Sequence, residues 1–328
     1  MRCLIDNTTD PYWNLAVEEY LLTRLQVPVF RLWRNAPAII VGRNQHTRSE
    51  INSEYVRENN IAVVRRLSGG GAVFHDLGNI NYTFADRYPP GTDTSEIFAR
   101  FTRPILDVLH TLGVNACLEG RNDLVIDGRK FSGNAIALHK NRILMHGTLL
   151  FSASMKDLSL ALKPKVREKT RGVPSNPRAV CNISEYLQQK MDAAGFLDIL
   201  KKHIAGNPGK TYKDEPLSEQ EHKIIRELCD CKYRTDSWNY GKDTAYSTAR
   251  KKRFAGGNME VLLNVRNGLI EEAKIYGDYF FLSPTRDIED ALAGCPHREE
   301  SIRKRFKNFR MEDYFRNIPP EDLIELLL

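Results

Sequence analysis

The order of hydrophobic and polar residues predicts helices packed against a sheet in the first third of the chain. An Asp-Pro pair opens residues 10–21, where apolar residues recur at helical spacing. Two apolar runs, 29–34 and 38–41, predict strands joined by a turn. A capping aspartate then opens a longer helix over 93–112, which Gly113 should end.

Two more strands are predicted at 61–64 and 79–84, and a glycine-rich segment joins them. This segment contains Arg65-Arg66 followed by Gly69-Gly70-Gly71. Glycines allow positive φ and bring backbone N–H groups close to a ligand, while the arginines can supply fixed positive charge, so the pattern favours an anion-binding loop. A surface turn flanked by solvated arginines is the alternative. The segment matches neither a Walker A loop nor the dinucleotide motif GxGxxG.

A second informative block is predicted to be a meander of strands. Asp127-Gly128 and Lys140-Asn141 are turn sequences between strand-like runs that extend to residue 151. By two-residue alternation Lys130, Ser132 and Asn134 should share one face of the sheet, with Phe131 on the other. Three polar side chains on one face suit an active site. Without this context, a solvated residue beside a turn is the favoured interpretation of Lys130. His146 on the next strand, taken by itself, is more often a structural histidine than a catalytic base.

Residues 163–184 are basic, rich in proline and glycine, and poorly periodic. Long segments of this kind are functional lids or linkers, and Arg171 and Arg178 favour a lid over an anionic ligand. The polar and irregular stretch 238–253 suggests a domain boundary. We therefore predict a catalytic domain over 1–245 and an accessory domain over 246–328.

The predicted fold is α/β (α+β): a mixed, largely antiparallel sheet with flanking helices, plus a small α+β accessory domain. The accessory domain should contain a hairpin sheet turned at Asn267-Gly268 and helices near 288–292, 299–306 and 321–328.

Composition limits the possible classes of protein. The chain has 328 residues, 41% of them hydrophobic, which is enough for a core without disulfides. Its six cysteines are scattered and lack a zinc-site spacing, so free thiols are expected. The sequence shows no targeting leader and no apolar run that could span a bilayer, which predicts a cytoplasmic protein without a membrane partner. The net charge of +6 fits an anionic small molecule, nucleic acid or an acidic protein equally well.

Several motifs together resemble the lipoate-protein ligase A family, in its long bacterial form with a C-terminal accessory domain. The match covers nearly the whole chain. The motifs are Asn14-Leu15-Ala16-Val17-Glu18-Glu19, Leu32-Trp33-Arg34-Asn35, Val41-Gly42-Arg43-Asn44-Gln45, residues 66–79, Gly120-Arg121-Asn122-Asp123-Leu124, Arg129-Lys130-Phe131-Ser132-Gly133, His146-Gly147-Thr148-Leu149-Leu150 and Ser237-Trp238-Asn239-Tyr240-Gly241.

The resemblance implies a biotin/lipoate ligase-like catalytic domain and a two-step reaction. Lipoate and ATP, with Mg²⁺, would form lipoyl-AMP, and a lysine of an acceptor lipoyl domain would then take the lipoyl group. The implied acceptors are the E2 subunits of 2-oxoacid dehydrogenases and the glycine cleavage H protein.

The resemblance also assigns roles to residues. Lys130 would be catalytic, lying between the lipoate carboxylate and the α-phosphate, and Asp123 would bind Mg²⁺. The ATP or adenylate would contact Arg66, Gly71, Ala72, Val73, Phe74, Asn122, Asp123 and Lys130. Lipoate would contact Trp33, Ser68, Gly69, Gly70, His75, Lys130, Ser132 and His146. The lid with Arg171 and Arg178 would cover the adenylate.

Other functions remain open from the sequence. A lipoyltransferase that uses preformed lipoyl-AMP shares most of these motifs, and a biotin ligase is a more distant possibility. An octanoyl transferase would need an activated cysteine, and Cys181 shows no activating neighbour. A nucleic-acid binder is disfavoured because the basic residues are not interleaved with aromatic residues.

Overall fold

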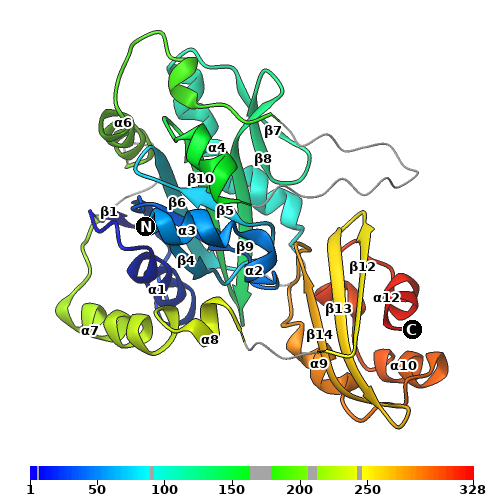
Figure 1. Ribbon diagram of the computed structural model, residues 1–328. Helices are drawn as coiled ribbons and strands as arrows, with labels where there is room; N and C mark the ends of the chain where they lie inside the picture. Colours follow the sequence, from blue (N-terminus) through cyan, green and yellow to red (C-terminus); the bar gives the residue numbers. More distant parts are fainter. Residues whose placement is uncertain (6, 89–91, 163–178, 206–212, 242–245) are drawn as a thin grey trace. The chain divides into compact units, whose positions relative to one another are not determined.

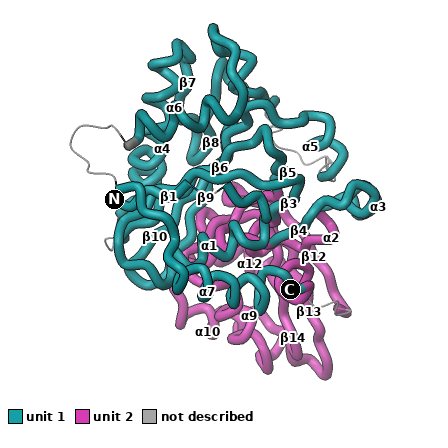
Figure 2. Tube along the Cα trace, turned by 90° about the vertical axis from the view of Figure 1, so that its left-hand side faces the viewer, with its two compact units in different colours: residues 1–40, 51–64, 73–235 teal, residues 41–50, 65–72, 236–328 magenta. Residues whose placement is uncertain are grey.

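The computed structural model describes residues 1–5, 7–88, 92–162, 179–205, 213–241 and 246–328. They form two compact units. Unit 1 consists of residues 1–40, 51–64 and 73–235, and unit 2 of residues 41–50, 65–72 and 236–328 (Figure 2). Two short segments from the first quarter of the chain thus belong to the same unit as its C-terminal residues. The predicted boundary between residues 245 and 246 stays a prediction.

Unit 1 is built on an eight-stranded sheet with the order β11-β1-β2-β6-β10-β9-β8-β7 (Figure 1). β1 pairs in parallel with β2 and β11, and the other neighbours pair antiparallel, so the predicted mixed, largely antiparallel sheet is confirmed. The strands are β1 (Arg2–Ile5), β2 (Val29–Trp33), β6 (Asn79–Arg87), β7 (Ala116–Glu119), β8 (Asp123–Ile126), β9 (Arg129–His139), β10 (Arg142–Leu150) and β11 (Lys213–Asp214).

Helices cover both faces of this sheet (Figure 1). On one face α4 (Thr94–Thr111) and α6 (Ala193–Ala205) pack against the main hydrophobic core, which includes Leu32, Tyr82 and Phe131. On the other face lies α1 (Pro11–Thr23), whose N-cap Asp10 accepts a hydrogen bond from the Tyr12 N–H at 2.9 Å, as its sequence predicted. The α1 face carries the alternate residues of the same strands, and many of these are polar.

A second sheet contains the strands that flank the glycine-rich segment. Its order is β4-β3-β5, from β3 (Ala38–Val41), β4 (Ala62–Arg65) and β5 (Val73–His75). The predicted strands at 29–34 and 38–41 therefore belong to different sheets. The segment between 64 and 79 is also not one continuous loop, because β5 pairs antiparallel with β3 inside it.

The C-terminal part of unit 2 contains a three-stranded sheet, β12-β13-β14, formed by β12 (Thr248–Phe254), β13 (Gly257–Arg266) and β14 (Leu269–Gly277). Asn267 and Gly268 have φ of 52° and 74°, which confirms the predicted hairpin turn. The prediction of an irregular stretch to residue 253 is wrong, because β12 begins within it. A run of four cations gives this strand a polar sequence that does not indicate a strand. The sheet packs with α9 (Arg286–Leu292), α10 (Glu299–Phe306), α11 (Met311–Tyr314) and α12 (Pro320–Leu327).

The remaining short helices are α2 (Thr47–Glu50), α3 (Ser53–Glu58), α5 (Met155–Ala161), η1 (Ile183–Glu185), α7 (Glu219–Leu228), η2 (Cys229–Tyr233) and α8 (Asp236–Asn239). All six cysteines are free thiols, as predicted. Within the described ranges, no helix is both long enough and apolar enough to cross a membrane.

Candidate active site

The predicted site residues fall into two groups, one in each unit. The group in unit 2 is the glycine loop, residues 66–72. Here the guanidinium of Arg66, 6% exposed, donates to Ser68 Oγ at 3.0 Å and to the carbonyl oxygens of Gly69 and Gly71 at 2.7 and 2.8 Å. In a trans peptide the next N–H points away from the carbonyl, so the N–H groups of Gly70 and Ala72 point away from Arg66. This is the arrangement that an anion-binding loop needs.

The glycine loop tolerates no side chain at two of its positions. Gly70 has a φ of 90°, which favours glycine. A Cβ on Gly69 would lie 2.6 Å from the carbonyl oxygen of Tyr279, whose side chain is fully buried in the same unit. Glycine is therefore required at residue 70 by backbone conformation and at residue 69 by close packing.

The sequence had suggested that both arginines supply positive charge beside the glycine loop. Arg65 does not. Its guanidinium is directed into the 42–47 turn, where it donates to Gly42 O, Arg43 O and Gln45 O. Burial, with a contribution from Arg43, lowers the pKa of Arg65 to about 10. The guanidinium nevertheless stays protonated at neutral pH.

The group in unit 1 depends on a β-bulge at Phe131. In the register of β8 with β9, Leu124 pairs with Ser132, but Val125 pairs with Lys130. Leu124 and Val125 are adjacent in β8 and point to opposite faces of the sheet. Their partners in β9, Ser132 and Lys130, therefore point to opposite faces as well. The prediction that they share one face is wrong, because the extra residue of the bulge interrupts the two-residue alternation.

Lys130 lies on the α1 face of the sheet. Its Nζ is 3.1 Å from the position that a Cβ would take on Gly133, which pairs with Asp123. The ammonium forms an ion pair with Asp123 Oδ1 at 2.8 Å, and the two side chains are 33% and 22% exposed. Lys130 is therefore a partly buried cation that solvent and a ligand can reach. The neighbouring Asn122 side chain donates to the main-chain carbonyl of Asn134 and helps to join β8 to β9.

Ser132 lies on the α4 face and belongs to a structural cluster. It is 1% exposed, and its Oγ accepts a hydrogen bond from Asn134 Nδ2 at 3.3 Å. The buried Tyr82 hydroxyl donates to Asn134 Oδ1, and burial raises the pKa of Tyr82. Gly147 borders this cluster, since a Cβ there would lie 2.1 Å from Asn134 Oδ1. Ser132 is therefore left out of the lipoate site proposed below.

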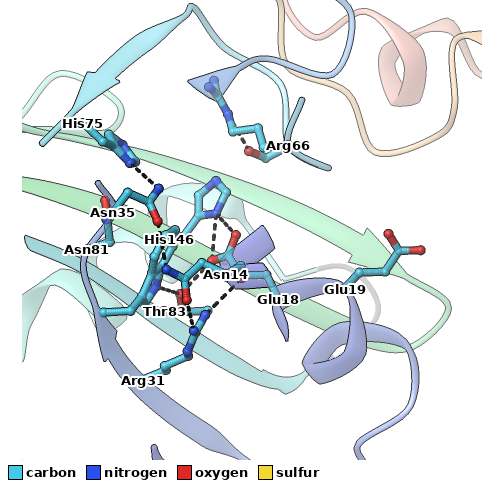
Figure 3. Close-up of polar contacts among 12 residues, drawn as sticks. Asn14, Glu18, Glu19, Arg31, Asn35, Arg66, His75, Asn81, Thr83 and His146 are labelled. Carbon is cyan, nitrogen blue, oxygen red and sulfur yellow. Dashed lines mark hydrogen bonds and ion pairs between the residues drawn. The ribbon is translucent and has the colours of Figure 1, made fainter. Parts of the chain in front are cut away.

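A buried polar network on the α1 face contains His146 (Figure 3). His146 Nδ1 is 2.8 Å from Glu18 Oε2, and Thr83 Oγ1 donates to Glu18 Oε1 at 2.6 Å. Trp33 Nε1 in turn donates to Thr83 Oγ1 at 2.9 Å, and Arg31 is held by Asn14. The network connects α1 to three strands and fixes His146 and Trp33 on one face.

Glu18 is the charged centre of this network, with 2% exposure. Burial alone would raise the pKa of Glu18, but the imidazole of His146, the hydroxyl of Thr83 and the charge of Arg31 together hold it below its usual value. Sequence analysis quoted Glu18 in a motif but gave it no role. A carboxylate in the apolar stripe of a helix was the available signal, because such residues are rarely buried without a partner.

His75 connects to the same network from β5. Its Nδ1 is 3.1 Å from Asn35 Nδ2, and its ring meets that of Trp33 edge-on at 6.3 Å between centroids. Asn35 Oδ1 accepts a hydrogen bond from Asn14 at 2.8 Å (Figure 3). Trp33, His75 and His146 are thus brought together, and their contact with lipoate stays a prediction. Phe74 of β5 is buried, and Val73 is half-buried.

The predicted lid is described only at its C-terminal end, and Arg171 and Arg178 lie outside the described residues. Residues 179–181 pair with β9 at Lys130 itself. The Lys130 N–H donates to Ala179 O at 2.9 Å, and the Cys181 N–H donates to Lys130 O at 3.0 Å. The C-terminal end of the predicted lid segment is therefore anchored to the backbone of the candidate catalytic residue.

The fold has counterparts among solved structures. Plasmodium falciparum LipL1, in complex with lipoate, matches with a TM-score of 0.79 and 25% identity, covering 99% of this chain and 97% of that one. A lipoate-protein ligase A bound with ATP matches with a TM-score of 0.64 and 26% identity, covering 73% of this chain and 98% of that one. A bipartite lipoate-protein ligase from Thermoplasma acidophilum, studied with its E2 lipoyl domain, matches with a TM-score of 0.64 and 25% identity, over 75% and 98%. The class is thus defined as a biotin/lipoate ligase-like fold.

Sequence comparison identifies the family within that class. Residues 10–205 match the lipoyl protein ligase A/B catalytic domain, and residues 243–327 match the bacterial lipoate protein ligase C-terminus. Lipoate-protein ligase LplJ of Bacillus subtilis is 40% identical and lipoate-protein ligase 1 of Staphylococcus aureus 39% identical, each over 98% of both chains. The chain belongs to the lipoate-protein ligase family and is an enzyme of that family.

Proposed function

We propose that the chain is an ATP-dependent lipoate-protein ligase that catalyses two steps. Lipoate and ATP first form lipoyl-AMP and pyrophosphate. A lysine amine of an acceptor lipoyl domain then attacks the acyl carbon, forms an amide and releases AMP. The observation that carries this proposal is the position of Lys130, which the bulge at Phe131 turns toward the face that also holds Trp33 and His146.

Charge is the main obstacle to the first step, because the lipoate carboxylate must attack a negatively charged phosphate. Lys130 would supply a cation between the two anions, and an ammonium on a flexible stem can turn from Asp123 toward both. In the second step the same cation would stabilise the negative charge that develops on the acyl oxygen. Holding the two anions in line supplies a further part of the acceleration.

The glycine loop supports ATP as the nucleotide substrate. Its N–H groups at Gly70 and Ala72 point away from Arg66, where they can donate to phosphate oxygens. We assign the adenylate to residues 66 and 71–74, as the resemblance implies. The lipoyl chain would lie against Trp33, His75 and His146.

The protein side chains that the structure describes do not alone supply enough ligands for Mg²⁺, so the nucleotide would have to supply the others. Among the described residues, no group of three or more His, Cys, Asp or Glu side chains could hold a metal. Mg²⁺ is often bound by one or two carboxylates together with substrate phosphates, so Asp123 would supply one ligand and ATP the others. When bound, the ion would neutralise phosphate charge.

The alternative activities differ in what they require. An octanoyl transferase needs a reactive thiolate, but Cys181 is fully buried and burial raises the pKa of its thiol. A lipoyltransferase needs lipoyl-AMP supplied from outside and would bind the same adenylate in the glycine loop, so the experiment below is what separates it from the ligase. The acceptors are lipoyl domains, and we propose E2 subunits and the H protein among them. Cytoplasmic location stays a prediction.

The test is intact-mass spectrometry of a purified apo lipoyl domain after incubation with this enzyme. One tube contains lipoate, Mg²⁺ and ATP, and a second contains synthetic lipoyl-AMP without ATP. The lipoyl mass increment in both tubes is expected. An increment only with lipoyl-AMP would make the enzyme a transferase, and no increment in either tube would reject the ligase.

A further inference from the structure

Arg65 is a buried hub that connects three segments of unit 2. It is 6% exposed. Its Nη1 donates to the carbonyl oxygens of Gly42, Arg43 and Gln45 at 2.7–3.0 Å. Its Nη2 donates to Thr47 Oγ1 at 2.6 Å, and Nε and Nη2 reach two carbonyl oxygens of α8, those of Trp238 and Asn239, at 2.9 and 3.1 Å.

The main chain of Arg65 strengthens the same connection. Its N–H donates to Asn239 Oδ1 at 3.0 Å, and its carbonyl accepts from Trp238 Nε1 at 2.9 Å. The guanidinium of Arg43 also lies 4.2 Å from the centroid of the Trp238 ring. Residue 65 therefore holds the 42–47 turn and α8 in one geometry.

The 42–47 turn in turn supports the glycine loop. The Arg43 N–H donates to Ser68 O at 2.9 Å, and the Arg66 N–H donates to Val41 O at 2.9 Å. A Cβ on Gly42 would lie only 1.9 Å from Gly70 O. The turn and the loop are thus packed backbone against backbone, so a shift of the turn by a few tenths of an ångström must move Gly70.

We propose that Arg65 is a positioning residue for the nucleotide, which it serves by fixing the 42–47 turn and, through the turn, the glycine loop. The proposal rests on the proposed function of that loop. Only a guanidinium suits the position, because it offers five N–H donors in one plane, whereas a lysine offers three from a single point. Arg65 therefore acts on ATP affinity through the backbone, and Arg66 is the residue assigned to the ligand.

The proposal is tested with Arg65→Lys and Arg65→Ala by isothermal titration calorimetry with a non-hydrolysable ATP analogue and, separately, with lipoate. The Kd for the analogue should rise at least tenfold in both variants, while the Kd for lipoate changes less than twofold. Millimolar guanidinium should restore part of the affinity of Arg65→Ala for the analogue, and ammonium should not. Arg48→Ala is the control, because this guanidinium lies over the Tyr240 ring and its loss should leave both constants unchanged.

Several outcomes would overturn the proposal. These are an unchanged Kd for the analogue in Arg65→Lys, or equal losses for both ligands together with a lower melting temperature. Should Arg65→Ala fail to fold, Gly42→Ala tests the contact between the 42–47 turn and the glycine loop. This variant should weaken binding of the analogue and leave binding of lipoate unchanged. If the unmodified enzyme binds neither ligand, the proposed function itself fails, which separates that result from a failure at Arg65.

Discussion

The glycine loop and the α1 face of the large sheet are fixed by different kinds of interaction. In the loop, the buried guanidinium of Arg66 donates mainly to carbonyl oxygens, and Gly69 and Gly70 leave no space for side chains. On the α1 face, side chains pair with each other: Lys130 forms an ion pair with Asp123, and the His146 ring contacts the buried carboxylate of Glu18. The loop is thus held by shape and the sheet face by charge. Substitution should disturb the first through packing, and pH should disturb the second.

The largest effect is expected on the sheet face. Lys130→Met should lower kcat/KM for lipoyl-AMP formation by about 10²- to 10³-fold, because it removes the cation between two anions. Lipoate-dependent ATP–pyrophosphate exchange measures this step. Lys140→Met, in the turn at the other end of β9, is the matched control and should behave as the unmodified enzyme does. A loss of less than tenfold would remove Lys130 from the chemistry.

On the α4 face of the large sheet, the close packing around Gly147 should contribute to stability. Gly147→Ala should lower the free energy of unfolding by about 1–3 kcal/mol, because the added Cβ meets Asn134 and Tyr82. Urea denaturation measures this change. If stability is unchanged, the cluster around Tyr82 is looser than its buried contacts indicate. Close packing against a glycine would then be a weaker constraint than the comparison assumes.

The Glu18–His146 pair should make stability sensitive to acid. The folded-state pKa of Glu18 is lowered from 4.5, so its contribution is present above that pH and is lost as the pH falls through the folded pKa. Between pH 6 and 3.5 the unmodified enzyme should therefore lose more stability than Glu18→Gln does. Melting temperatures across this range test the difference, with Glu54→Gln on the exposed face of α3 as control. Parallel curves for all three would contradict the argument.

The smallest effect is expected at Ser132, which we place outside the lipoate site. Ser132→Ala should cost about 1 kcal/mol of stability, the value of one buried hydrogen bond, and should change the Kd for lipoate less than twofold. Denaturation and calorimetry on the same preparation give both numbers. A large loss of lipoate affinity at unchanged stability would return Ser132 to the site.

Local signals in the sequence predicted most of the elements. Asp10 and Asp93 cap the helices where expected, and the turns at 127–128 and 267–268 have the positive φ that their residues favour. These features depend on a few neighbouring residues, which is why they could be found. Trp33, His75 and His146 were grouped through the family resemblance, and the structure places them on one network.

Other features depend on partners distant in sequence. The bulge at Phe131 exists only in the register of β9 with β8, so alternation along β9 alone misassigned Ser132. β5 is three residues long and takes its structure from β3. Likewise, nothing near Arg65 in the sequence shows that its acceptors lie at residues 42–47 and 238–239.

The packing of the glycine loop also bears on the order of events during synthesis. Residues 65–72 leave the ribosome well before Tyr279, against which Gly69 packs, and before Gly277, whose N–H donates to Asn44 O at 2.5 Å. At ordinary translation rates the intervening chain takes roughly 10–40 s to make. Until then the loop lacks part of its support, so a nascent chain should acquire tight ATP binding only when its synthesis is nearly complete.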